Sequence, residues 1–271
     1  MRKTGSLRWW WMVAVSLAVV PVGAQSPSPF LAALDAIAQR QLRARADVIA
    51  GIKDMAAAEA RKKAVREKVL SLIGGLPDYR GPLRPRVTKT TPRDGYVIEN
   101  VMFDSLPDYV VTANLYRPDR PGRYPAILMS MGHWDSGKAA GQLLSVNLAR
   151  RGFVVLAYDP VGQGERQQAF DPRFGRSLIG GPTDQHFSNG AAAILMGQAL
   201  SRYFIHDGMR AIDYLVSRPE VDPDRIGATG CSGGGTQTTY ISALDPRIKA
   251  TAVACYMNSF QTLFAGSLLK R

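Results

Sequence analysis

The chain has 271 residues, of which 46% are hydrophobic and 21% are charged. This mixture allows a sizeable buried core and excludes a disordered tail, a coiled coil and a small disulfide scaffold. The net charge of +12 is unevenly distributed, because residues 25–94 carry 14 basic and 7 acidic side chains, whereas residues 95–271 carry 17 and 15. The bulk of the chain is therefore nearly neutral.

The first 24 residues have the features of an export signal. Arg2, Lys3 and Arg8 precede an apolar run at 9–20, and a Val-Gly-Ala sequence ends at Ala24. Twelve apolar residues make a helix of about 18 Å, too short for about 30 Å of hydrocarbon. We expect residues 1–24 to be a cleaved signal peptide and the protein to be periplasmic or secreted, with no stable membrane insertion after cleavage. An uncleaved anchor is the alternative.

Residues 25–81 are expected to form a helical N-terminal extension. Residues 30–73 are rich in Ala, Leu, Arg and Lys, and a Gly pair followed by Pro77 ends this helical stretch. Basic residues lie on both sides of Val65 and Leu70, which is typical of the solvated face of an amphipathic helix. The stretch has almost none of the aromatic side chains that a nucleic-acid surface requires, so we expect no nucleic-acid partner.

Residues 82–271 alternate between strand and helix patterns. The expected elements are, in chain order, a hairpin of strands at 96–103 and 109–116, a buried strand at 125–131, a helix at 139–151, a buried strand at 153–159, an irregular segment at 160–189, a two-piece helix at 191–217, a strand at 225–229, a helix at 233–243 and a strand at 250–254. This order predicts an α/β domain with a mostly parallel sheet and helices on both faces.

A candidate nucleophile lies between the last predicted strands. Residues 230–234 read Gly-Cys-Ser-Gly-Gly, a G-x-S-x-G sequence between a predicted strand and a predicted helix. Ser232 would lie at a helix N-terminus, where free N–H groups and the helix dipole favour developing negative charge. We therefore expect Ser232 to be the catalytic nucleophile and the Gly233 N–H to be one oxyanion donor. The alternative is a Gly-rich turn that merely begins a helix.

A second oxyanion donor is expected in the loop after an earlier strand. Residues 132–134 read Gly-His-Trp directly after a buried strand, so the backbone N–H of His133 or Trp134 fits this role. The His133 imidazole is expected to form a pocket wall, since the base of such a site belongs after the last strand.

Residues 159–166 follow the next buried strand and include three closely spaced polar groups of interest. Asp159 is expected to bond nearby backbone groups, and Glu165 and Arg166 are candidate substrate-binding residues. The irregular segment that follows is long enough to act as a lid, and its His186 is a third candidate for substrate binding.

These segments resemble secreted bacterial α/β-hydrolases of the acetyl xylan esterase-like group. The resemblance is carried by residues 132–134 with Lys138, by 157–166, by 221–227 and by 232–238, and it extends from about Pro82 to the end of the chain. It implies a serine carboxylesterase that acts on acylated sugars without a metal or cofactor. Many relatives carry another residue at the position of Cys231. The Gly-Cys-Ser sequence is similar to the elbow of glucuronoyl esterases, but Gly233 and Gly234 stand where that second group would have a charged continuation.

The usual partners of the serine are missing after the elbow. In this fold the acid and the histidine follow the serine in the chain, but His133, His186 and His206 all precede Ser232. The only later carboxylate is Asp245. We therefore expect residues 82–271 to be a C-terminally incomplete α/β-hydrolase domain whose last strands are missing, and the chain as given to be inactive. A pseudoenzyme and a triad that uses His186 are the alternatives.

The expected function is hydrolysis of carboxylic esters, acetyl or related esters on plant-type carbohydrates, through an acyl-enzyme on Ser232. The expected partner is thus a small-molecule or polysaccharide ester. Three alternatives stay open: a glucuronoyl esterase-like enzyme, a peptidase of the same fold, and a non-catalytic carbohydrate-binding protein.

The two cysteines are expected at the same edge of the sheet. Cys231 follows one strand and Cys255 ends the next, and neighbouring strands run about 4.8 Å apart, within the Cα separation of about 4.4–6.8 Å that a disulfide requires. The strained elbow opposes bonding, and buried free cysteines are common. A disulfide and two free thiols both remain open.

Overall fold

The structure is a computed structural model that describes residues 29–265, so the expected signal peptide at 1–24 lies outside the described residues. Residues 50–258 form one compact unit that contains the whole main sheet. The helices α1 (Pro29–Ala50) and α7 (Phe260–Ala265) belong to a second unit. Among the described residues, no helix has both the length and the apolar character needed to cross a membrane.

The N-terminal helical part is present, but it consists of two helices where one was expected. α1 ends at Ala50 and α2 runs over Met55–Leu72. Gly51 follows α1, and the Asp54 side chain begins α2 by accepting a hydrogen bond from the Ala57 N–H at 2.8 Å. A glycine followed by a capping aspartate favours a break more strongly than the surrounding helix formers favour continuity.

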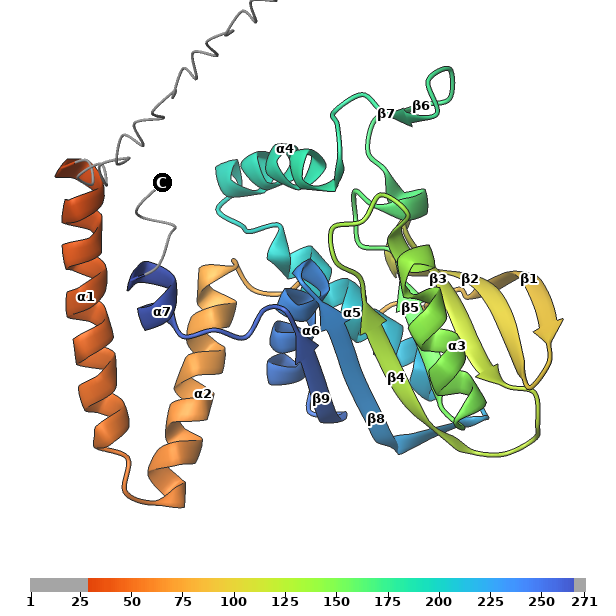
Figure 1. The fold of residues 1–271 in the computed structure, drawn as a ribbon, viewed down its shortest axis with the longest axis horizontal. Coiled ribbons are helices and arrows are strands. Elements are labelled where there is room, and N and C mark those ends of the chain that lie inside the picture. The colour runs from red at the N-terminus through yellow and green to blue at the C-terminus, as the bar shows by residue number, and fades with distance from the viewer. Residues whose placement is uncertain (1–28, 266–271) are drawn as a thin grey trace, which may run out of the picture. The chain divides into compact units, whose positions relative to one another are not determined.

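A seven-stranded sheet forms the centre of the larger unit (Figure 1). Its strands in spatial order are β1 (Arg86–Arg93), β2 (Tyr96–Leu106), β3 (Tyr109–Pro118), β5 (Val154–Tyr158), β4 (Tyr124–Ser130), β8 (Val221–Cys231) and β9 (Ile248–Ala254). The pairs from β1 to β5 are antiparallel, and the pairs from β5 to β9 are parallel. The carboxyl ends of β4, β5 and β8 therefore meet at one edge.

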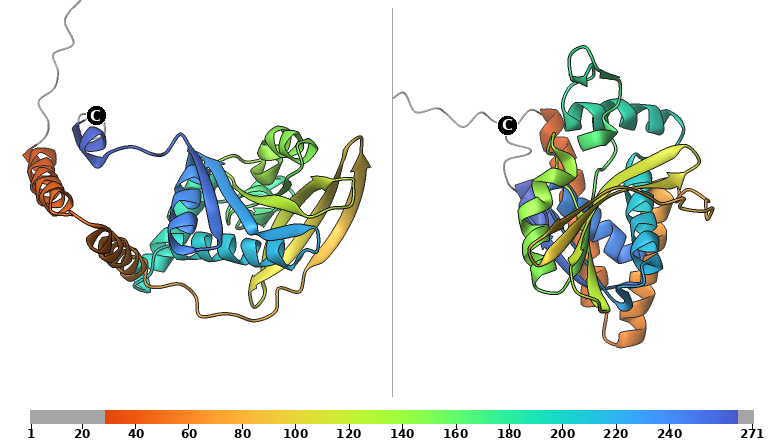
Figure 2. Two further views of the ribbon diagram at one scale, coloured as in Figure 1. Left: turned by 90° about the horizontal axis from the view of Figure 1, so that it is seen from below. Right: turned by 90° about the vertical axis from the view of Figure 1, so that its right-hand side faces the viewer.

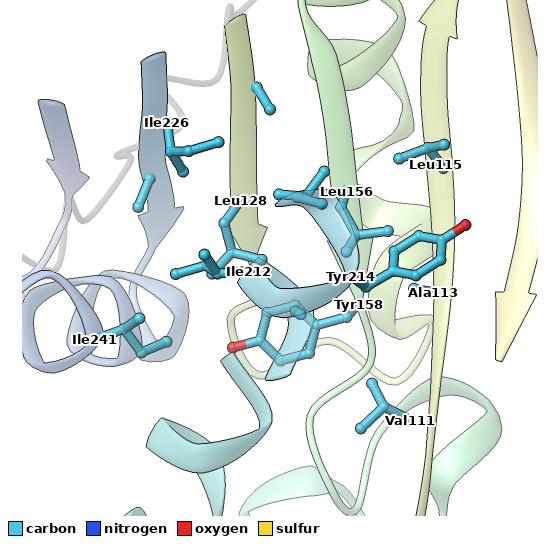
Figure 3. Close-up of a cluster of buried hydrophobic side chains, with 14 of the residues drawn as sticks. Val111, Ala113, Leu115, Leu128, Leu156, Tyr158, Ile212, Tyr214, Ile226 and Ile241 are labelled. Atoms are coloured by element: carbon cyan, nitrogen blue, oxygen red, sulfur yellow. The ribbon is translucent and has the colours of Figure 1, made fainter. Parts of the chain in front are cut away.

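Helices cover both faces of this sheet, as the sequence predicts. α3 (Gln142–Arg150) packs on one face, and α5 (Ser201–Ser217) and α6 (Gly233–Leu244) pack on the other (Figure 2, right). The larger core lies under α5 and α6, where Leu128, Leu156 and Ile212 are fully buried (Figure 3). A smaller cluster lies under α3. The two cores fix the sheet and thereby the loops at its edge.

Two sequence expectations are wrong. β1 was not expected, because its Thr, Lys, Arg and Pro residues are mostly exposed and lack a period-two apolar pattern. Residues 160–189 are not irregular throughout, since they include the short hairpin of β6 (Phe170–Asp171) and β7 (Arg176–Ser177) and the start of α4 (Pro182–Leu195). α4 begins nine residues earlier than the helix expected at 191, because proline occupies its first turn and the Asp184 carboxylate accepts from the Gly181 N–H at 3.0 Å.

The core makes a direct prediction for stability. We expect Leu156→Ala to lower the free energy of unfolding by about 2–5 kcal/mol, because it removes a fully buried side chain and leaves a cavity. Leu143→Ala on α3, where the side chain is 77% exposed, should change it by less than about 0.5 kcal/mol. Urea denaturation of both variants measures the difference, and equal losses would contradict the packing described.

Candidate active site

Ser232 occupies a strained turn between β8 and α6. β8 ends at Cys231, α6 begins at Gly233, and Ser232 between them has φ 58° and ψ −122°. A positive φ in a residue with a Cβ atom costs about 1–3 kcal/mol and persists only where the surroundings enforce it. Here the Ser232 N–H donates to the Ala254 carbonyl of β9 at 3.0 Å, which holds the turn against the neighbouring strand.

Two glycines allow the turn to approach β4 closely. A Cβ atom on Gly230 would lie 2.4 Å from the Gly234 carbonyl oxygen, and one on Gly234 would lie 2.1 Å from the carbonyl oxygen of Ser130. No side chain fits at either position, because real Cβ atoms do not approach backbone so closely. The outer glycines of the G-x-S-x-G sequence are therefore required by packing, and they place Ser232 at the carboxyl edge of the sheet.

The loop after β4 lies beside this turn. A Cβ atom on Gly233 would lie 2.7 Å from the Nδ1 atom of His133, so the imidazole covers the first residue of α6. The Trp134 N–H donates to the Gly132 carbonyl at 2.8 Å within the loop itself. Among the described residues, we find no hydrogen-bond acceptor for the His133 N–H. Of the two expected donors in this loop, His133 thus has the free N–H.

Gln163 holds the same loop from the other side. Its side chain is 1% exposed, and its Nε2 donates to the carbonyl oxygens of Gly132 and Trp134. In a trans peptide, the carbonyl of one residue and the N–H of the next point in opposite directions. By fixing the Gly132 carbonyl, Gln163 also fixes the direction of the His133 N–H.

Asp159 connects the loops after β4 and β5. Its carboxylate is fully buried and accepts from the Lys138 N–H at 2.7 Å, from the Lys138 ammonium at 2.5 Å and from the Thr112 hydroxyl at 2.6 Å. The Lys138 ammonium also donates to the largely exposed carboxylate of Glu165. From the sequence, Asp159 was expected to bond nearby backbone groups. The structure adds an ion pair with Lys138, which joins the loops after β4 and β5, and a hydrogen bond from Thr112 of β3.

Arg166 is largely enclosed. Its guanidinium forms an ion pair with the buried Asp207 of α5 at 2.8 Å, donates to the Asp159 carbonyl at 3.0 Å and lies over the Tyr109 ring at 4.7 Å. Only 7% of the residue is exposed. The guanidinium therefore ties the loop after β5 to α5 and β3, while the neighbouring Glu165 faces solvent.

His186 of α4 lies next to His133. The two ring centroids are 5.0 Å apart, and the His186 Nε2 contacts the Val161 carbonyl at 2.8 Å. A carbonyl only accepts, so this nitrogen carries the proton and cannot accept another from Ser232. Burial lowers the pKa of His186, which favours the neutral imidazole at neutral pH.

The remaining titratable candidates lie elsewhere. His206 is 1% exposed, and its Nδ1 contacts the Ser105 hydroxyl at 3.0 Å. Asp245 is also 1% exposed and forms an ion pair with Arg247 at 2.6 Å. Asp245 follows the last turn of α6, and a 12-residue helix is about 18 Å long, so this carboxylate lies far from Ser232. None of these groups forms a triad with Ser232 within residues 29–265.

Comparison with known proteins gives the family. A model of acetyl xylan esterases (AXE1) matches residues 88–265. The chain belongs to the acetyl xylan esterase family. A Bacillus subtilis (strain 168) protein named "Putative hydrolase YtaP" is 29% identical over 203 residues, which are 70% of this chain and 62% of that protein.

Two solved structures are similar to this acetyl xylan esterase family member. Methylesterase BT1017 has a TM-score of 0.60 and 28% identity, covering 81% of this chain and 45% of that one. Acetyl xylan esterase 1 from Thermoanaerobacterium sp. JW/SL YS485 has a TM-score of 0.52 and 22% identity, covering 71% and 57%. These matches confirm the α/β-hydrolase fold. The chain spans about half the length of both structures.

Three residues of the site were not expected from the sequence. Gln163 and Lys138 stood in segments that carried the resemblance, but no role was assigned to either. Asp207 lies in the middle of a helix and gave no signal. The side chains of these residues act through partners that are 21 to 41 residues away in the chain. In the sequence, only the small residues next to Gln163, Lys138 and Asp207 indicate that these positions are closely packed.

Both cysteines are free thiols in the structure. Cys231 pairs in register with Ala254, so Cys255 lies beside the elbow, and its hydrogen bond with Cys231 raises the pKa of the Cys231 thiol. A raised thiol pKa means less thiolate at neutral pH and slower alkylation.

We therefore expect iodoacetamide at pH 8 to modify the exposed Cys255 before Cys231, with two thiols in total. Peptide mass spectrometry over a time course gives the order, and Cys255→Ser is the control that isolates Cys231. Faster modification of Cys231, or a linked pair of peptides from the untreated protein, would contradict this.

Proposed function

We propose that this protein is a serine esterase in which the Ser232 hydroxyl attacks an ester carbonyl. The attack forms a tetrahedral intermediate, whose collapse releases the alcohol and leaves an acyl group on the Ser232 oxygen. Water then hydrolyses this acyl-enzyme. The N–H groups of Gly233 and His133 are the proposed oxyanion donors. Gly233 directly follows Ser232, the His133 ring covers Gly233, and neither N–H has an acceptor among the described residues.

The observation that carries this proposal is the backbone of Ser232. A non-glycine residue at φ 58°, between a buried parallel strand and a helix N-terminus, is the strained turn of a nucleophile elbow. A Gly-rich turn that only began a helix would not need a side chain at the one strained position. The site is therefore organised around the exposure of this hydroxyl.

The acid and the base are proposed to come from outside residues 29–265. The His186 Nε2 is bound to a carbonyl, His206 is buried against Ser105, and Asp245 lies at the far end of α6. β9 is the outer strand among the described residues, and most of its residues are exposed. The match covers only 62% of the Bacillus subtilis relative and 45% of the methylesterase, which leaves room for further strands beyond β9, where this fold carries the acid and the histidine.

The proposed substrate is a carbohydrate that carries acetyl or related esters. The family match supports the reaction class, and the expected signal peptide supports export to the compartment where plant-type polysaccharides are encountered. A methyl ester is a second candidate, because the match to the methylesterase covers 81% of this chain at 28% identity.

The proposal is tested with the protein expressed from its complete reading frame. We expect Ser232→Ala to abolish hydrolysis of acetylated xylan or of a methyl-esterified polyuronate, because the covalent route requires the hydroxyl. Ser217→Ala, an exposed serine at the end of α5, is the matched control. Acetate and methanol released from the two polymers identify the ester, and full activity of Ser232→Ala would refute the role of this serine.

A second expectation concerns residues 1–271 alone. Without a base beside it, the Ser232 hydroxyl stays protonated, so we expect no stoichiometric labelling by an organophosphonate ester. Intact-mass spectrometry measures the label. Rapid and complete labelling would mean that a histidine within this chain activates Ser232, and His186→Ala would then identify it.

The hydrogen bonds of Gln163 predict a loss of turnover on substitution. Gln163→Glu replaces a donor by a carboxylate that would face two carbonyl oxygens, so the His133 N–H should lose its orientation. We expect kcat to fall by about 10²–10³, the usual cost of one oxyanion donor, with a much smaller change in KM. Gln167→Glu, four positions along the same loop, is the comparison. An unchanged kcat in Gln163→Glu would contradict the proposed donor.

A further inference from the structure

A cavity lies between His133 and α4, next to the candidate active site. The cavity has a volume of about 470 Å³, within the range of ligand pockets in proteins. Its lining is mainly apolar and includes His133, Thr183, Phe187, Gly190 and Ile194. Because the His133 ring also covers Gly233, this cavity begins directly beside the proposed nucleophile.

α4 is fixed in place by buried contacts on its other side. Gln185 is 2% exposed, accepts from the Gln168 N–H at 2.7 Å and donates to the Gly180 carbonyl at 2.9 Å. His186, which itself lines the cavity, adds its bond to the Val161 carbonyl. Figure 1 shows α4 beyond the edge of the sheet at which these loops lie. The helix is therefore anchored beside the site and presents its opposite face to the cavity.

That opposite face is mainly apolar and exposed. Thr183, Phe187, Gly190 and Ile194 follow one another at intervals of four, three and four residues, which places them on one side of a helix. Phe187 is 81% exposed and Ile194 is 71% exposed. A Cβ atom on Gly190 would have no atom within 4 Å, so the centre of this face is open.

Two imidazole rings form the inner wall. The rings of His133 and His186 are tilted at 57° with centroids 5.0 Å apart, and the edge of the Phe204 ring, which is not part of the lining, contacts His186 at a centroid distance of 5.0 Å. Such rings favour a further ring in offset or edge-on contact. A sugar ring needs several hydrogen-bonding partners, and this wall has few, because the His186 Nε2 is already bound.

We propose that this cavity binds an aromatic ring on the acyl or the alcohol part of the ester. The inference rests on the proposed esterase function and adds a substrate class to it. The ring would lie between the imidazole of His133 and the exposed face of α4, with Gly190 leaving room for it. Esters with a phenyl group should then be preferred over small esters that lack one.

The test uses the protein from its complete reading frame and three substrates, with released acid measured by titration. The substrates are ethyl acetate, 2-phenylethyl acetate and ethyl 3-phenylpropanoate, which have no ring, a ring on the alcohol and a ring on the acyl part. We expect kcat/KM for at least one ring-bearing ester to exceed that of ethyl acetate by about tenfold or more, since single methylene groups in apolar pockets already give such ratios.

Three variants locate the preference. Gly190→Leu places a side chain in the open centre of the cavity and should abolish the preference, while ethyl acetate hydrolysis is retained. Ala192→Leu places the same side chain at an exposed position of α4 outside the cavity and should leave the preference intact. Phe187→Ala, at a mostly exposed position where folding is not at risk, should weaken the preference several-fold. Equal kcat/KM values for all three esters, or a preference unaffected by Gly190→Leu, would overturn the proposal.

A binding measurement separates this inference from the proposed function. Saturation-transfer NMR with 2-phenylethanol and 3-phenylpropanoate needs no turnover. If no ester is hydrolysed but one of these ligands binds and Gly190→Leu removes the signal, the esterase proposal fails and the aromatic site stands. If xylobiose binds in a manner that Gly190→Leu blocks and neither phenyl ligand does, the cavity is a sugar site and the inference is wrong.

Discussion

The buried carboxylate of Asp159 is the interaction on which the candidate site depends. It joins β3 through Thr112, the loop after β4 through Lys138, and its own loop after β5. A buried carboxylate is costly unless it is paired and hydrogen-bonded, and here both conditions hold. Loss of either partner would leave a buried charge, so the two loops are held in one arrangement. The positions of His133 and Gln163 follow from this arrangement.

The strain at Ser232 is maintained by contacts on three sides. Gly230 and Gly234 permit close contact with β4, the Ala254 carbonyl fixes the Ser232 N–H, and the His133 ring covers Gly233. A backbone in a sparsely populated region needs this degree of enclosure. The N–H groups of Gly233 and His133 have no acceptor among the described residues. The contacts that stabilise the turn therefore also hold the proposed nucleophile and its proposed oxyanion donors.

The sequence predicted most of the fold because its signals are local. The apolar runs of β4, β5 and β8, the hairpin of β2 and β3, and the elbow at Ser232 all follow from patterns within a few residues. β1 was missed because an exposed edge strand needs no apolar face, and the start of α4 was missed because its first turns are polar. The break after α1 follows from Gly51 and the Asp54 cap. These are local signals, and the sequence prediction missed them because it relied on the average helix propensity of residues 30–73.

By itself the sequence determined the fold class, the family resemblance and the serine at the centre of the site, since spacing and side-chain size decide these. Only the tertiary structure decided which backbone N–H groups have no acceptor and that Gln163 orients the loop after β4. It also decided that Arg166 is enclosed by Asp207 and Tyr109, and that a cavity lies between α4 and His133. These properties depend on distances between segments far apart in the chain. Burial and hydrogen-bond partners are set only when the sheet brings those segments to one edge.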